Sequence, residues 1–91
     1  MAKFAGYNVV PYNKTSTDTR NFMLGLRTLI MIQLRFQSIE IHQAINQNRL
    51  GFVLFLNKSK LPIWLPEDIL GVARVKDAEN YIIQNYPEYF L

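Results

Sequence analysis

The clearest signal in the pattern of hydrophobic and polar positions is the uninterrupted apolar run FVLFL at residues 52–56. A short apolar run rich in β-forming residues is typical of a strand that is buried on both faces. The run therefore predicts a central strand of a sheet. A further strand is expected over residues 4–12, where Val9 and Val10 favour extended backbone and Pro11 either ends the strand or confines it to a sheet edge.

Two periodicities compete between residues 20 and 36. Read as a helix, this segment has an apolar stripe at Met23, Leu26, Ile30 and Leu34. Read as a strand, it alternates apolar side chains at Ile30, Ile32, Leu34 and Phe36. Gly25 would weaken one long helix by about 1 kcal/mol relative to alanine. The favoured interpretation is a helix over residues 18–26, capped by Ser16, Thr17 or Asp18, and a strand over residues 29–36.

The next segment, residues 39–49, predicts a helix. Ser38 offers an N-cap, Ile41, Ala44 and Ile45 make a narrow apolar face, and Gly51 is suited to the position after a helix end. Residues 57–60 are expected to form a turn.

The remaining segments complete an α+β pattern. Residues 61–65 predict a short edge strand or a rigid extended connection, and Pro66 can open a helical turn through residues 67–69. A strand is expected over residues 72–75, followed by a last helix that Asp77 caps and Pro87 ends. We expect residues 1–91 to form a single small α+β domain, with a mixed or antiparallel sheet of three to five strands and two or three helices.

Composition argues against catalytic and metal chemistry. The chain has no cysteine and a single histidine, His42, whereas zinc and related metals need several nitrogen or sulfur ligands. Its four glycines lie too far apart for a phosphate-binding loop. Glu67 and Asp68 follow Pro66, where the first turn of a helix favours acidic side chains. We expect no enzyme activity and no cofactor.

The apolar runs are far shorter than the roughly 18 residues that span a bilayer. We therefore expect a protein with no membrane partner and a cytoplasmic location.

Charge is divided along the chain. Residues 1–60 carry eight Lys or Arg residues against two acidic ones, and the balance reverses after residue 60. The predicted helix over residues 39–49 would present Asn46 and Arg49, which can bond the base edges of DNA or RNA. Lys58 and Lys60 could contact phosphates, as could Arg27 and Arg35 if they share that surface. The first hypothesis is a non-catalytic nucleic-acid-binding protein.

The second hypothesis is a protein-interaction or self-associating accessory protein. It is based on aromatic and apolar residues near prolines, which are hard to bury completely in so small a domain. These residues are Trp64, Tyr86, Tyr89, Phe90 and Leu91. They would favour a protein partner or a homodimer.

Overall fold

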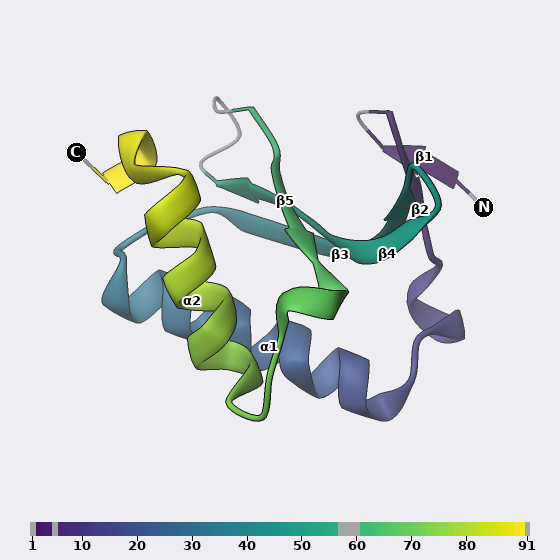
Figure 1. Cartoon of the computed structure of the whole chain (residues 1–91), viewed down its shortest axis with the longest axis horizontal. Helices are drawn as coiled ribbons and strands as arrows, with labels where there is room; N and C mark the ends of the chain where they lie inside the picture. Colours follow the sequence, from purple (N-terminus) through teal and green to yellow (C-terminus); the bar gives the residue numbers. More distant parts are fainter. Residues whose placement is uncertain (1, 5, 57–60, 91) are drawn as a thin grey trace.

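The strands of the protein form one antiparallel sheet with the strands in chain order (Figure 1). The computed structural model describes residues 2–4, 6–56 and 61–90. The strands are β1 (Ala2–Phe4), β2 (Tyr7–Val9), β3 (Ile39–Asn46), β4 (Arg49–Leu56) and β5 (Ile63–Pro66). The helices are α1 (Thr17–Gln33) and α2 (Arg74–Asn85), with 3-10 turns η1 (Tyr12–Lys14), η2 (Glu67–Ile69) and η3 (Pro87–Phe90). The predicted α+β class is confirmed.

Both helices cover the same face of the sheet, as Figure 1 shows. The core lies between the helices and the sheet. In it, the rings of Phe22 on α1 and Phe52 on β4 have centroids 4.9 Å apart. Its other fully buried members include Leu26, Ile30, Leu54, Leu56, Ile63, Leu65, Ala78 and Ile82. Strand β4 pairs with β3 on one side and β5 on the other. The prediction of a central strand over residues 52–56 is therefore confirmed.

Helix α1 is continuous, so the predicted strand over residues 29–36 is wrong. The cap is as expected: the Ser16 hydroxyl oxygen accepts a hydrogen bond from the Thr19 N–H at 3.1 Å. The helix runs through Gly25, where α2 comes close, because a Cβ at this position would lie 3.4 Å from Val75 Cγ2. Burial of Leu26 and Ile30 against the sheet offsets the low helix propensity of glycine.

The predicted helix over residues 39–49 is also wrong, because this segment forms the β3–β4 hairpin. Its turn residues Gln47 and Asn48 have φ angles of 53° and 64°, in the left-handed region that a two-residue hairpin turn requires. Pairing with the apolar β4 along the whole of β3 decides the outcome. Gly51, expected after a helix end, lies inside β4 beneath the ring of Trp64.

Smaller corrections concern the two ends of the chain. The N-terminal segment is a hairpin rather than one strand, with Gly6 between β1 and β2 at a φ of 89°. The strand expected over residues 72–75 is wrong, because α2 begins at Arg74. Asp77 lies inside the first turn of α2, and its carboxylate accepts a hydrogen bond from the Gly71 N–H at 2.8 Å.

The edge strand after residue 60 and the helical turn over residues 67–69 are confirmed as β5 and η2. The expected turn over residues 57–60 lies outside the described residues.

On the face away from the helices, Tyr7 of β2 stacks on Trp64 of β5. Their ring centroids are 5.5 Å apart and their planes differ by 13°. Burial raises the pKa of Tyr7, and the neighbouring Tyr86 adds to the effect. This stack joins the first hairpin to the last strand across the sheet.

In the part of the chain that the structure describes, no helix is both long and apolar enough to cross a membrane.

Candidate interaction groove

The four described residues that were predicted to bind nucleic acid do not all lie at one end of β3. Arg27 lies on α1, Arg35 follows it, Asn46 ends β3, Arg49 begins β4, and Lys58 and Lys60 lie outside the described residues. Asn46 and Arg49 are partners across the hairpin turn, whereas Arg27 lies beside Ile39 at the opposite end of β3. Arg49 Nη2 donates to both carboxylate oxygens of Asp68, at 2.9 and 3.0 Å. The predicted helix that would present Asn46 and Arg49 is absent, because residues 39–49 belong to the β3–β4 hairpin.

Three aromatic residues of the second hypothesis, Trp64, Tyr86 and Tyr89, pack on the domain itself. Trp64, Tyr86 and Tyr89 are half-buried, and the Tyr86 hydroxyl receives a hydrogen bond from the Trp64 N–H at 3.2 Å. The same hydroxyl donates to the Trp64 carbonyl at 3.4 Å. One phenol thus covers part of the outer edge of β5. The side chain of Phe90 and all of Leu91 lie outside the described part of the structure.

Strand β3, by contrast, is open along half of its outer edge. The pairing of β2 with β3 ends at the hydrogen bond from the Val10 N–H to the Gln43 carbonyl, 2.8 Å long. Pro11 comes next, has no N–H to donate, and leads the chain out of the sheet into η1. Residues 39–42 therefore have β4 on one side, and no strand among the described residues lies on the other.

In an antiparallel sheet, successive residues of a strand direct their backbone N–H and C=O groups alternately to its two neighbouring strands. Since Gln43 directs its carbonyl toward β2, Ile41 and Ile39 direct their N–H and C=O groups to the same side. Glu40 and His42 direct theirs toward β4, with which both are paired. The open edge thus presents a short row of donors and acceptors, the arrangement that takes up an additional strand.

Two adjoining cavities lie along this open edge, with volumes of about 280 and 210 Å³. They share Tyr12, Met23 and Ile41. We call the combined depression the β3–α1 groove and define it by Tyr12, Arg20, Met23, Leu24, Arg27 and Ile41. Met23 is buried, whereas the Leu24 side chain on the helix wall is 61% exposed. The groove therefore combines an apolar lining with an unpaired strand edge.

Two arginines of α1 make the groove positively charged. Arg20 is held in place: its Nε donates to the Tyr12 carbonyl and to Thr15 Oγ1, both at 3.2 Å, and its guanidinium carbon lies 5.0 Å from the centroid of the Tyr12 ring. Arg27 is exposed. Among the described residues, the ion pairs include neither of these arginines. Glu40 also lines the groove, but its carboxylate lies 2.9 Å from His42 Nε2.

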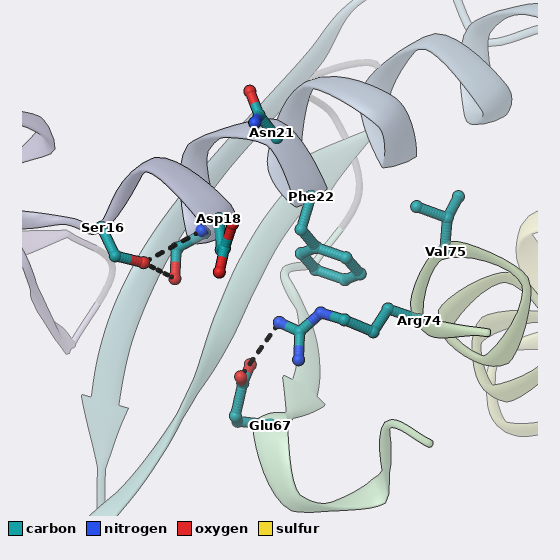
Figure 2. A pocket seen from close by; sticks show the side chains of 8 residues that line it. Ser16, Asp18, Asn21, Phe22, Glu67, Arg74 and Val75 are labelled. Carbon is teal, nitrogen blue, oxygen red and sulfur yellow. Dashed lines mark hydrogen bonds and ion pairs between the residues drawn. The ribbon is translucent and has the colours of Figure 1, made fainter. Parts of the chain in front are cut away.

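A larger cavity of about 540 Å³ lies between the N-terminal turns of α1 and α2 (Figure 2). Figure 2 shows Arg74 between Phe22 and Glu67. Its Nη2 donates to Glu67 Oε1 at 3.0 Å, and its guanidinium carbon lies 4.9 Å from the centroid of the Phe22 ring. These contacts tie η2 and α2 to α1. Because Glu67 pairs with Arg74 and Asp68 with Arg49, the two carboxylates do not face one another.

Within residues 2–4, 6–56 and 61–90, no group of three or more His, Cys, Asp or Glu residues is arranged to hold a metal ion.

Sequence reasoning missed most of the groove. The spacing of Arg20, Leu24 and Arg27 places them on one stripe of a helix. The sequence does not show which other element this stripe faces. The sequence predicts that Pro11 either ends a strand or confines it to a sheet edge. What it leaves open, namely half of the neighbouring β3, becomes visible only in the assembled sheet.

The chain matches no protein-family model, no curated protein sequence and no solved structure.

Proposed function

We propose that the chain is a non-catalytic binding protein that takes an extended segment of a partner protein as an added strand in the β3–α1 groove. The observation that carries the proposal is the outer edge of β3 at Ile39 and Ile41, where no strand among the described residues pairs, beside an apolar groove. A peptide that adds to a sheet edge gains affinity from main-chain hydrogen bonds and specificity from pockets for alternate side chains.

The groove supplies both parts of this mode of binding. The outward backbone of Ile39 and Ile41 offers donors and acceptors to the main chain of the partner. Alternate side chains of the added strand would point to the helix-covered side of the sheet, where Met23 and Leu24 line the 280 Å³ cavity of the groove. Burial of apolar side chains there adds about 25 cal/mol for each Å² removed from water.

The nucleic-acid hypothesis stays a prediction with less support. The helix predicted over residues 39–49, on which it depends, is absent, and Arg49 forms an ion pair with Asp68. A homodimer and a cytoplasmic location likewise stay predictions.

Selection from a random peptide library displayed on phage tests the proposal. We expect the protein to enrich sequences that contain a proline-free extended core, because proline cannot donate to a strand ladder. The Leu24→Gln variant should weaken the binding of the selected peptides at least about fivefold, since it removes apolar contact from the groove wall.

The Ile32→Gln variant is the matched control. Ile32 is as exposed as Leu24 and lies on the same helix, but it does not line the groove. Its affinities should stay within about twofold of those of the wild type. A selection that enriches no sequence, or equal losses in the two variants, would refute binding in this groove.

A further inference from the structure

We infer that the segment bound in the β3–α1 groove is acidic, with two carboxylate side chains that flank an apolar one at alternate positions; this inference rests on the strand addition proposed above. Three features of the groove support it: the charge of its helix wall, the fixed position of one arginine, and the order of the residues along α1.

The positive charge of the helix wall favours an anionic ligand. Arg20 and Arg27 both line the 280 Å³ cavity of the β3–α1 groove, and among the described residues no carboxylate forms an ion pair with either. The one acidic residue of that lining, Glu40, is within hydrogen-bond distance of His42. An anionic strand would therefore meet two guanidinium groups without displacing an existing ion pair.

Arg20 is prepared for such a contact. Its Nε is bonded to Tyr12 and Thr15, and its planar head lies over the Tyr12 ring, so the side chain is fixed before any ligand arrives. A side chain that is already ordered loses little conformational freedom on binding. The terminal nitrogens of a guanidinium group suit a carboxylate well, because two parallel N–H groups can meet its two oxygens.

The order of residues along α1 sets the order in the ligand. Arg20, Leu24 and Arg27 span two helical turns, about 10 Å along the axis. Positions i, i+2 and i+4 of a strand lie on one face and span about 13 Å. The length of Arg and Glu side chains covers the difference. The pattern is thus acidic-x-apolar-x-acidic, for example Glu-x-Val-x-Glu, with the apolar side chain facing Leu24 and each carboxylate facing one arginine.

Three synthetic peptides test the inference by fluorescence anisotropy: Thr-Glu-Thr-Val-Thr-Glu-Thr and its forms with Gln or Lys in place of both Glu residues. We expect the Glu peptide to bind the wild-type protein about tenfold more tightly than the Gln peptide and the Lys peptide to bind weakest. This preference should shrink as salt is raised. Single-stranded oligothymidylate is measured in parallel as an anionic polymer that cannot add a strand.

Two arginine variants locate the effect. Arg27→Gln should reduce the preference for Glu over Gln at least about threefold. Arg35→Gln makes the same change of charge at an arginine that does not line the groove, and should leave the preference within about twofold of that of the wild type.

The outcomes separate this inference from the proposed function. Equal binding of the Glu and Gln peptides, or equal effects of the two arginine variants, would overturn the acidic preference while strand addition stands. Binding of oligothymidylate with no binding of any of the three peptides would overturn the acidic peptide and favour a nucleic-acid partner. If the peptides selected from the library also fail to bind the protein, the proposed function itself is refuted.

Discussion

Replacing Gly51 by alanine is expected to lower the free energy of unfolding by about 3 kcal/mol, the upper part of the usual range for overpacked sites. A Cβ at this position would lie 2.5 Å from the Leu65 carbonyl oxygen and 2.6 Å from Trp64 Cζ2. Both neighbours belong to β5, which is paired with β4 at this point, so the backbone oxygen cannot yield without opening the ladder. Urea unfolding followed by circular dichroism measures the loss.

Gly25→Ala is the matched control for this prediction. Gly25 lies in the interior of α1, and its added Cβ would make an ordinary contact of 3.4 Å with Val75 Cγ2. Because alanine is the better helix former, the free energy of unfolding should stay unchanged or rise by up to about 1 kcal/mol. Similar losses in the two variants would show that the close approach of β5 to Gly51 is not the cause.

Methylating alternate backbone nitrogens of a groove-binding peptide is expected to lower its affinity at least about tenfold, which corresponds to about 1.4 kcal/mol. In an added strand, every second N–H points toward Ile39 and Ile41, and a methyl group there removes the hydrogen bond and blocks the approach of the two backbones. Two series of a selected peptide are compared, each peptide with one methylated backbone nitrogen: in one series this nitrogen points toward β3, and in the other it points away. Isothermal titration calorimetry measures the affinity of each peptide.

The other series of methylated peptides is an internal control, because its nitrogens point away from β3. Its affinity should fall less than about threefold, the residual change reflecting altered backbone preference. A peptide that tolerates methylation equally in both series binds by its side chains alone, and the open edge of β3 would then have no part in binding.

The parts of the fold that the sequence predicts correctly are those with one dominant local signal. The apolar run at residues 52–56 allows no polar face, and Pro66 followed by two acidic residues specifies a short helical turn. Ser16 similarly marks the start of α1. In each case the signal lies within a few residues and agrees with the tertiary environment.

The wrong predictions fall where two periods fit the same residues. Ile41, Ala44 and Ile45 suit one face of a helix, while Ile39, Ile41 and Ile45 suit one face of a strand. The choice depends on β4, whose apolar residues need a partner strand along their whole length. At Gly25 the tertiary structure overrides a local signal, because burial of Leu26 and Ile30 in the core keeps α1 continuous through a poor helix former.

The interaction groove depends still more on distant parts of the chain. Arg20, Leu24 and Arg27 have recognisable helical spacing, but nothing near them in the sequence shows that they face β3. The open edge arises because Pro11 leads the chain away from a strand that is far off in the sequence. Which strand edge lacks a neighbouring strand, among the described residues, is a property of the assembled sheet that local patterns do not encode.

Backbone amide exchange of the ¹⁵N-labelled protein, with and without a selected peptide, tests the open edge of β3 most directly. In the free protein the amide of Ile41 should exchange quickly and that of His42, which faces β4, slowly. A saturating peptide should slow exchange at Ile41 and Ile39 by about tenfold or more and change His42 much less. An Ile41 amide that is already protected in the free protein, or that the peptide leaves unprotected, would contradict strand addition at this edge.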